Sequence, residues 1–225
     1  MDTKRIAVLG SGVVGQALAD GFLAHGHEVM RGSREPGKLA EWKRSAGSTA
    51  STGTFAEAAR FGAIVVLAVK GTAAESVVKL AGIENLAGKT VIDAVNPIAD
   101  EPPDHGVLRF FTGLNDSLME RLQRLAPAAQ FVKAFSCVGN ALMVHPDFGG
   151  VKPTMFICGD NAQAKREVTA ILDRFGWETE DMGGVEGARA IEPLCMLWCI
   201  PGLARNQWRH AFKLLRQGGV PRING

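Results

Sequence analysis

Tyrosine is missing from this chain of 225 residues. Its absence excludes every reaction mechanism in which a tyrosine hydroxyl acts as the acid, including the Tyr-x-x-x-Lys chemistry of short-chain dehydrogenases. The chain also lacks a surplus of charge, since 25 Lys and Arg residues face 23 Asp and Glu residues and leave a net charge of +2. A nucleic-acid-binding domain usually carries a basic patch or stripe, so this balance argues against a nucleic-acid partner.

Cysteine is scarce, and its four positions form no metal-binding pattern: Cys137, Cys158, Cys195 and Cys199. None belongs to a Cys-x-x-Cys pair, and no Cys/His cluster has the spacing of a zinc site. Cys195 and Cys199 are four residues apart and share one face of a predicted helix, which leaves a metal pair as the alternative to two buried thiols. We expect reduced, buried thiols, no metal and a cytoplasmic location.

Long apolar runs are missing as well. No span reaches the roughly 20 apolar residues that a membrane helix requires, so we expect no membrane segment. The N-terminus superficially resembles a signal peptide, because Lys4-Arg5 precedes an apolar run. Glycines from Gly10 onward interrupt that run and leave only residues 6–9 apolar without a break. We therefore expect a chain that is not secreted.

What the chain does contain is an alternation of predicted strands and helices. Residues 63–69 are seven consecutive apolar, largely β-branched residues, which predicts a strand covered on both faces, as in a parallel sheet. The predicted strands are 4–9, 27–31, 48–51, 63–69, 90–94 and 130–135, and the predicted helices between them are 14–22, 36–46, 55–60, 73–81 and 117–125. This order is typical of an α/β fold with a Rossmann-type doubly wound parallel sheet.

The last third of the chain predicts a small α/β C-terminal portion. Strands at 154–158 and 177–182 flank a helix that Asp160 or Asn161 begins and Gly176 ends. Residues 187–216 have a mainly helical pattern, with a break expected at Pro201-Gly202, and the tail 218–225 is expected to fray. The apolar side chains of that helix predict a homodimer: Trp198, Trp208, Phe212, Leu214 and Leu215.

Gly10, Gly12 and Gly15 form a Gly-x-Gly-x-x-Gly motif between the first predicted strand and the first predicted helix. In this context the motif indicates dinucleotide binding. Gly10 permits a tight turn, Gly12 lets the backbone approach a pyrophosphate, and Gly15 lets the helix pack against the strand. The helix N-terminus then offers N–H groups to the phosphate. The alternative is a glycine-rich turn that binds nothing.

The end of the second predicted strand favours NADP(H). Gly32-Ser33-Arg34 stands where an NAD-binding chain carries an acidic residue for the ribose 2′-hydroxyl. Ser33 can donate a hydrogen bond to a 2′-phosphate, and Arg34 can supply a charge-assisted fork. Arg31 and Lys38 are further cations nearby. The alternative is that Arg34 is a solvated surface residue.

Three later segments are expected to end at the same edge of the sheet, where ligands bind in such folds: Ala68-Val69-Lys70, Asn96-Pro97 and Ala134-Phe135. Lys70 either touches a phosphate or ribose of the cofactor or is a solvated lysine at a strand end. We expect residues 1–136 to form the NADP-binding domain. Residues 137–225 would then form a smaller portion for acceptor binding and dimerisation.

No acid–base dyad is evident, so no catalytic residue is assigned. A catalytic histidine would require an orienting carboxylate, and we expect no such role for any of the five: His25, His27, His105, His145 and His210. We expect His210 on a helix surface. Arg189 and Glu192 are three residues apart on a predicted helix and either pair with each other or orient the C-terminal portion over the cleft.

A long Pro- and Gly-rich loop at 97–115 is the best place for a lid, since loops of this length are often functional. Within it, Arg109, Phe110 and Phe111 could cover a flat ring, or the two aromatics could be tucked into the core to anchor the loop. Trp198 likewise leaves two alternatives: it could line an acceptor pocket, or it could fill the core. We favour anchoring for the loop and the core for Trp198.

The motifs together resemble the coenzyme F420-dependent NADP oxidoreductase family. The resemblance rests on residues 10–15, the Ser33-Arg34 pair, Asn96-Pro97 and a C-terminal block, and it covers nearly the whole chain. That block comprises Val132-Lys133-Ala134-Phe135, Phe156-Ile157-Cys158-Gly159-Asp160 and Ala188-Arg189-Ala190-Ile191-Glu192-Pro193-Leu194. The chain is also similar to the NADPH-binding domain of the STEAP metalloreductases, which in that family is joined to a membrane domain; we expect no such domain here. The resemblance implies cofactor contacts at Ser11, Gly12, Val13, Val14, Ser33, Arg34, Val69, Asn96 and Ala134.

The family resemblance implies hydride transfer between NADP(H) and a flat acceptor, either the deazaflavin coenzyme F420 or a flavin such as FMN or FAD. Such chemistry depends mostly on positioning, because the cofactors carry the reaction. Two alternatives remain. One is reduction of a small imine or carbonyl substrate; the other is an NADP(H)-sensing protein without turnover, since fold alone does not fix function.

Overall fold

A six-stranded parallel sheet forms the centre of the molecule in the computed structural model, which describes residues 3–217. Its strands lie in the order β3 (Ala50–Gly53), β2 (Glu28–Gly32), β1 (Arg5–Leu9), β4 (Ile64–Leu67), β5 (Thr90–Asp93) and β6 (Gln130–Lys133). The strand order reverses between β1 and β4, and a crevice opens at such a switch point. The predicted Rossmann-type sheet is therefore confirmed.

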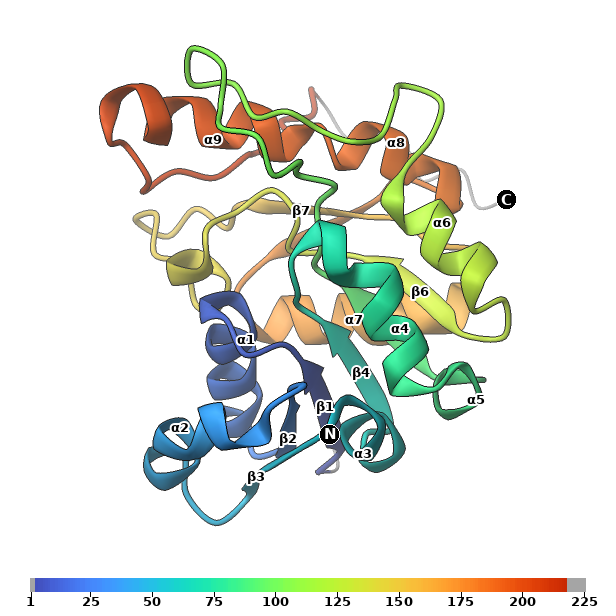
Figure 1. Ribbon diagram of the computed structural model, residues 1–225. Helices are drawn as coiled ribbons and strands as arrows, with labels where there is room; N and C mark the ends of the chain where they lie inside the picture. Colours follow the sequence, from blue (N-terminus) through green and yellow to red (C-terminus); the bar gives the residue numbers. More distant parts are fainter. Residues whose placement is uncertain (1–2, 218–225) are drawn as a thin grey trace.

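Helices cover both faces of this sheet (Figure 1). On β1, Ile6 and Val8 point into one apolar cluster, and Ala7 and Leu9 point into the other. The first cluster includes α1 (Val13–Ala24) and α7 (Ala162–Arg174), whereas the second includes α3 (Phe55–Phe61), α4 (Ala74–Ala81) and α6 (Leu118–Leu125). Two short helices, α2 (Ala40–Ser45) and α5 (Ile83–Leu86), complete this part of the chain. The sheet is buried on both faces, which explains its apolar strands.

A second, two-stranded parallel sheet is formed by β7 (Thr154–Ile157) and β8 (Glu178–Asp181), with α7 as the connection between them. It is joined to the first sheet where Lys133 of β6 pairs with Cys158 just after β7. The chain then continues into α8 (Ala188–Ile191) and α9 (Leu194–Arg205). Asn161 caps α7 by accepting a hydrogen bond from the Ala164 amide at 2.9 Å, so Asn161 rather than Asp160 begins this helix.

Several predicted elements are shorter than the sequence pattern indicates. The strand expected at 63–69 ends at Leu67, and the strand expected at 130–135 ends at Lys133. The helix expected at 36–46 is a 3₁₀ turn over Pro36–Leu39 followed by α2. A further 3₁₀ turn spans Asn140–Leu142. Beyond the strand ends, the amides of Ala68 and Ala134 still donate to the neighbouring strands, and the chain then turns into the crevice or the core.

The helical expectation for 187–216 is wrong in two places. α9 continues through Pro201, which removes only one backbone N–H from the helix; the interruption lies at Glu192-Pro193, between α8 and α9. After α9, Asn206 adopts a left-handed conformation with φ 54°, and the chain returns as an irregular strap over 206–216. Trp208, Phe212, Leu214 and Leu215 lie on this strap rather than on a helix. The predicted frayed tail 218–225 lies outside the described residues.

The loop after β5 folds back on itself across 97–111. The amide of Ala99 donates to the carbonyl of Arg109 at 2.8 Å, and the amide of Phe111 donates to the carbonyl of Pro97 at 3.0 Å. Phe111 is half-buried, and the Arg121 guanidinium lies 5.6 Å from its ring centroid. Phe111 therefore anchors the loop beside α6. Within residues 3–217, no helix has both the length and the apolar character needed to cross a membrane.

Candidate functional site

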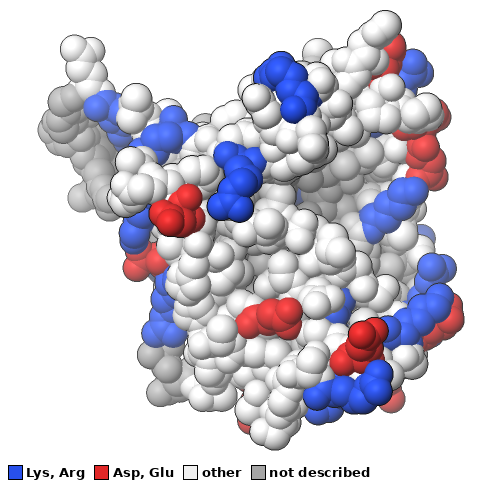
Figure 2. Space-filling view, turned by 90° about the vertical axis from the view of Figure 1, so that its left-hand side faces the viewer, with Lys and Arg blue, Asp and Glu red and all other residues white. Residues whose placement is uncertain are grey.

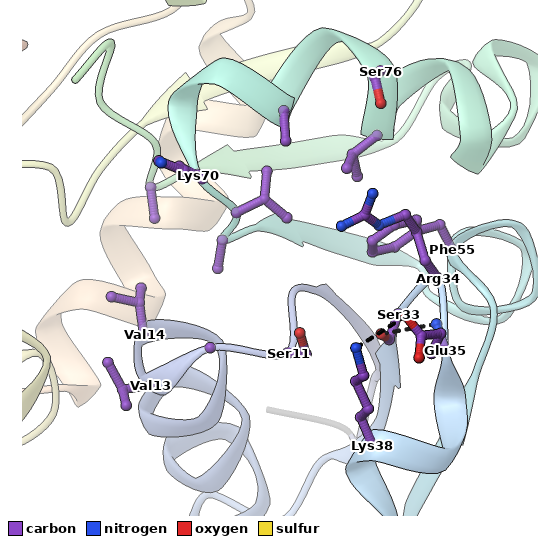
Figure 3. A pocket seen from close by; sticks show the side chains of 16 residues that line it. Ser11, Val13, Val14, Ser33, Arg34, Glu35, Lys38, Phe55, Lys70 and Ser76 are labelled. Carbon is purple, nitrogen blue, oxygen red and sulfur yellow. Dashed lines mark hydrogen bonds and ion pairs between the residues drawn. The ribbon is translucent and has the colours of Figure 1, made fainter. Parts of the chain in front are cut away.

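A cavity of about 410 Å³ opens where β1, β2, β4 and β5 end (Figure 3). Its walls come from the glycine-rich turn and the start of α1, from the segments after β2, β4 and β5, and from α3 and α4. The lining residues are Ser11, Gly12, Val13, Val14, Ser33, Arg34, Glu35, Lys38, Phe55, Ala68, Val69, Lys70, Ala73, Ser76, Val77 and Ala94. Its position at the carboxyl ends of parallel strands is that of a nucleotide site.

The three motif glycines act in different ways. Gly10 has φ +155°, and a Cβ there would lie 2.1 Å from the backbone oxygen of Ala68. A Cβ on Gly15 would lie 2.7 Å from the carbonyl oxygen of Gly10. These two glycines are needed for packing beneath the turn and do not line the cavity. A Cβ on Gly12, in contrast, would meet no atom within 4 Å, so the open space above Gly12 is available to a ligand.

The start of α1 has free hydrogen-bond donors. Gly12 is its N-cap residue and provides no side-chain acceptor, and the first turn contains no acidic residue. By comparison, Thr54, Ser117 and Asn161 cap α3, α6 and α7 with their side chains. The unsatisfied N–H groups and the positive end of the helix dipole make the cavity side of α1 suitable for a phosphate.

Arg31 supports the glycine-rich turn from below, a role that the sequence analysis missed. Its guanidinium donates to the carbonyl oxygens of Gly10 and Gly12 at 3.3 and 3.2 Å, and it lies 4.8 Å from the ring centroid of Trp42. Only 1% of Arg31 is exposed. Burial lowers the pKa of Arg31, and Asp20 opposes that shift. Arg31 is therefore not one of the cations that face the cavity. Its position within a predicted buried strand was the sequence feature that could have indicated this.

The cavity end beside β2 is polar and basic. Ser33, Arg34, Glu35 and Lys38 gather there, with Phe55 next to Arg34 (Figure 3). Lys38 Nζ lies 2.9 Å from Glu35 Oε1, and the Glu35 amide donates to Ser33 Oγ at 3.2 Å. Arg34 and Lys38 are both exposed, so their charges are available to an anion, while Glu35 partly balances Lys38.

The opposite cavity end is more apolar. Val13 and Val14 line it from α1, Ala94 lines it from the end of β5, and Lys70 stands at its edge (Figure 3). Val13 is 67% exposed, an unusual position for a large apolar side chain. Lys70 Nζ forms an ion pair with Asp100 of the returning loop. Lys70 thus both borders the cavity and ties the loop to the end of β4.

Most predicted contact residues come together here. Ser11, Gly12, Val13, Val14, Ser33, Arg34, Lys38, Ala68, Val69 and Lys70 all line the cavity. Asn96, Pro97 and Ala134 do not: Asn96 lies beyond Ala94 and donates through Nδ2 to the carbonyl of Ser136 at 2.7 Å, and Ala134 is fully buried. Contacts of these three with a cofactor remain predictions. The sequence analysis did not identify Phe55, Ala73, Ser76, Val77 and Ala94, because four of them are ordinary apolar residues and none belongs to a recognised motif.

The histidines that the sequence analysis considered for catalysis lie away from the cavity. His25 and His145 stack on each other with ring centroids 5.0 Å apart, and His25 hydrogen-bonds carbonyls where α1 and α7 end. His210 lies on the strap rather than on a helix, and its ring Nε2 is 2.9 Å from the carbonyl oxygen of Trp198. None of these histidines lines the cavity. Trp198 itself is buried and packs against the strap, as favoured for a core residue.

The cysteines are free thiols in the described part of the chain, and three of the four are buried. Burial raises the pKa of Cys137 and of Cys158 to about 12, which keeps both as thiols at neutral pH. Among residues 3–217, no group of three or more His, Cys, Asp and Glu side chains is arranged to hold a metal ion.

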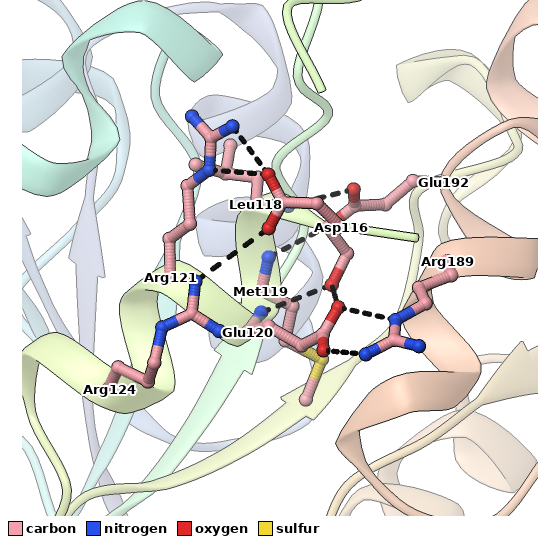
Figure 4. A network of polar contacts seen from close by, with 9 residues as sticks. Asp116, Leu118, Met119, Glu120, Arg121, Arg124, Arg189 and Glu192 are labelled. Carbon is pink, nitrogen blue, oxygen red and sulfur yellow. Dashed lines mark hydrogen bonds and ion pairs between the residues drawn. The ribbon is translucent and has the colours of Figure 1, made fainter. Parts of the chain in front are cut away.

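Polar contacts connect α8 to α6 (Figure 4). Arg189 does not pair with Glu192; its guanidinium binds both carboxylate oxygens of Glu120, at 3.0 and 2.6 Å. Glu192 instead accepts hydrogen bonds from the Leu118 and Met119 amides at the start of α6, both at 3.0 Å. Both residues therefore hold the C-terminal portion against the main sheet.

Known proteins are similar to this chain in sequence and fold. Residues 5–97 match the family described as NADP oxidoreductase, coenzyme F420-dependent. The fold superposes on a candidate F420-dependent NADP-reductase from Arthrobacter sp. FB24 with a TM-score of 0.88 and 32% identity, covering 95% of this chain and 100% of that one. An imine reductase from Aspergillus terreus in complex with NADPH4, 18% identical with a TM-score of 0.63, shares the fold over 88% of this chain and 61% of its own.

Metalloreductase STEAP3 of Rattus norvegicus is a further relative. It is 32% identical over 210 residues, which is 90% of this chain. The chain spans only 39% of the length of STEAP3. The similarity is therefore to one part of a longer protein.

Proposed function

Because this chain belongs to the coenzyme F420-dependent NADP oxidoreductase family, we propose that it binds NADP(H) in the 410 Å³ cavity and exchanges hydride with a deazaflavin or flavin-type acceptor. One observation carries the proposal. The uncapped start of α1 opens into the same cavity as Ser33, Arg34 and Lys38. Amide donors for a pyrophosphate and cations for a 2′-phosphate thus face a single elongated space.

The chain's own residues would act mainly by binding and orienting. When bound, the nicotinamide would supply or accept the hydride. Arg34 and Ser33 would hold the 2′-phosphate, and the amides at the start of α1 would hold the pyrophosphate. The apolar surface of Val13 and Val14 would exclude water beside the reacting ring.

Arg34→Ala tests the cofactor. We expect it to weaken NADPH binding by roughly tenfold or more while leaving NADH binding nearly unchanged, because a charge-assisted hydrogen bond to a phosphate contributes about 1.5–3 kcal/mol. Calorimetric titration with each dinucleotide measures both affinities. Arg44→Ala is the matched control, since Arg44 is exposed on α2 and does not line the cavity. Equal losses for NADPH and NADH would show that Arg34 does not bind the 2′-phosphate.

An acceptor screen tests the reaction. The protein is mixed with NADPH and, separately, with oxidised coenzyme F420, FMN, FAD or a cyclic imine, and the nicotinamide absorbance is followed. We expect rapid oxidation with F420 or a flavin. Oxidation with the imine alone would establish the small-substrate alternative. Tight NADPH binding without oxidation by any acceptor would favour the sensor. We also propose a cytoplasmic location, which the free thiols of the described chain support.

A further inference from the structure

Three charged side chains form a fully buried cluster at the ends of β5 and β6. Lys133 Nζ lies 2.7 Å from Asp93 Oδ2 and 2.9 Å from Glu192 Oε1. The side chains of Lys133 and Asp93 are 0% exposed, and that of Glu192 is 2% exposed. Asp93 and Lys133 are neighbours in the sheet, because β5 and β6 pair them in register.

Burying these three groups together is electrostatically costly. Burial by itself lowers the pKa of Lys133, but Asp93 and Glu192 outweigh that effect and raise it. Burial raises the pKa of Asp93, and the ammonium of Lys133 opposes the shift. Replacing a buried ion pair by apolar residues often leaves stability unchanged or increases it. Stability alone therefore does not explain three buried charges, and their contacts must be considered.

Two of the three residues hold the backbone beside the cavity. Lys133 Nζ donates to the carbonyl oxygen of Val95 at 2.8 Å, and Asp93 Oδ1 accepts from the amide of Val95 at 3.0 Å. Both main-chain groups of Val95 are thereby fixed. Val95 lies between Ala94, which lines the cavity, and Asn96. Glu192 does not hydrogen-bond Val95; its carboxylate accepts hydrogen bonds from the amides at the start of α6 instead.

The adjoining strand end is held in an unfavourable conformation. Phe135, two residues after Lys133, has φ 61° although it is not glycine, and it is 1% exposed. Asn96 bridges to this segment through its hydrogen bond to the Ser136 carbonyl. Such conformations persist only where surrounding contacts determine them, and they cluster at functional sites.

The topology places this backbone under the nicotinamide half of the cofactor. The 2′-phosphate side of the cavity lies at β2, so a bound dinucleotide would extend across the crevice toward β4 and β5. We infer that Asp93 and Lys133 are positioning residues: through Val95 they fix the adjacent Ala94, which lines the cavity, as the surface on which the nicotinamide ring rests. This inference depends on the proposed binding of NADP(H).

Two neutralising substitutions form a matched pair. Asp93→Leu and Glu192→Met each remove one carboxylate from the same ammonium, but only Asp93 accepts a hydrogen bond from Val95, which leucine cannot replace. For each variant, calorimetry measures the affinity for NADP⁺ and for 2′-phospho-ADP-ribose, which has the same phosphates and adenosine without nicotinamide. Their ratio reports the nicotinamide end alone. The melting temperature reports stability separately.

We expect the wild type to bind NADP⁺ more tightly than the nicotinamide-free analogue. Asp93→Leu should lower this ratio and slow hydride transfer by roughly tenfold or more, because misplacement of a reacting group by about 1 Å can cost a hundredfold in rate. Glu192→Met should keep the ratio even if it lowers the melting temperature as much as Asp93→Leu does. Equal changes of the ratio in both variants would reduce the cluster to a structural role and overturn the inference.

A further variant keeps the inference testable if the single variants do not fold. The triple substitution Asp93→Leu, Lys133→Met, Glu192→Met replaces all three buried charges by apolar side chains, and such replacements are often tolerated. It should bind the analogue as the wild type does and lose the preference for NADP⁺; retention of that preference would overturn the inference. If the wild type binds neither ligand, the proposed function itself fails. If it binds both with equal affinity, cofactor binding stands and the positioning role is wrong.

Discussion

At the scale of single residues, Arg31 and Arg34 show how two arginines three positions apart take different roles. Arg34 is exposed and faces the cavity, whereas Arg31 is buried and donates to the carbonyls of Gly10 and Gly12. Sequence spacing places both near the end of the second strand and cannot separate them. In the structure, Arg31 belongs to β2 and points beneath the turn, where Trp42 covers it, whereas Arg34 lies two residues beyond the end of the strand.

Arg31→Met tests the supporting role. The methionine keeps apolar contact with Trp42 but donates no hydrogen bond, so the two carbonyls of the glycine-rich turn lose their partner. We expect stability to fall by about 1–3 kcal/mol and the affinities for NADPH and NADH to fall together. Urea unfolding and dinucleotide titration measure these effects. A loss confined to NADPH would instead assign Arg31 to the 2′-phosphate.

At the scale of secondary structure elements, the contact of α8 with α6 depends on the Arg189–Glu120 ion pair. The hydrogen bonds from Arg189 are the main cause that lowers the pKa of Glu120, and Ser117 adds to the effect. A carboxylate with a lowered folded-state pKa contributes stability above its unfolded value, here near 4.5, and loses that contribution as the pH falls through the folded value.

Arg189→Met should therefore reduce stability at neutral pH only slightly, because the arginine is partly exposed. The difference from the wild type should shrink as the pH falls below 4.5, since Glu120 becomes protonated in both proteins. Thermal melting across this pH range measures the difference. Arg124→Met is the control, because Arg124 lies on α6, the helix that carries Glu120, and pairs with Asp116 instead. A pH-independent difference would show that the carboxylate charge does not matter.

Elements with a strong local signal were predictable, and those fixed by distant contacts were not. The glycine motif, the buried strand of residues 64–67 and the capped helix α7 follow from patterns within about fifteen residues. The strap at 206–216 has a helical pattern, but contacts with Trp198 and with Thr154 of β7 hold it in an irregular form. The buried Lys133 cluster joins residues 40 and 59 positions apart in the chain, and no local pattern indicates it.

At the scale of the whole molecule, the side shown in Figure 2 carries acidic and basic residues in small mixed groups, with a wide uncharged surface between them. The proposed homodimer has less helical surface than the sequence indicates, because α9 ends at Arg205. Leu197 and Leu203 of α9 and Trp208 of the strap remain exposed by 55%, 41% and 39%. These apolar side chains still support an interface between two copies.

We predict a dimeric mass by light scattering at micromolar concentration. Leu197→Glu combined with Leu203→Glu should shift the mass to that of a monomer, since charges in an apolar interface oppose association. Leu114→Glu is the control, because Leu114 is 87% exposed on the loop and lies outside α9. A monomeric wild type would exclude the dimer.

The strap also bears on the order in which the protein forms during synthesis. The amide of Thr154 donates to the carbonyl of Phe212 at 2.8 Å, and the amide of Leu214 donates to the hydroxyl of Thr154 at 3.1 Å. The β7 edge therefore stays open on the ribosome for the time needed to translate about sixty further residues. The cofactor half, complete by β6, has already emerged. A nascent chain stalled before residue 206 would present a nucleotide-binding sheet beside an unpaired strand edge, and such edges recruit other chains.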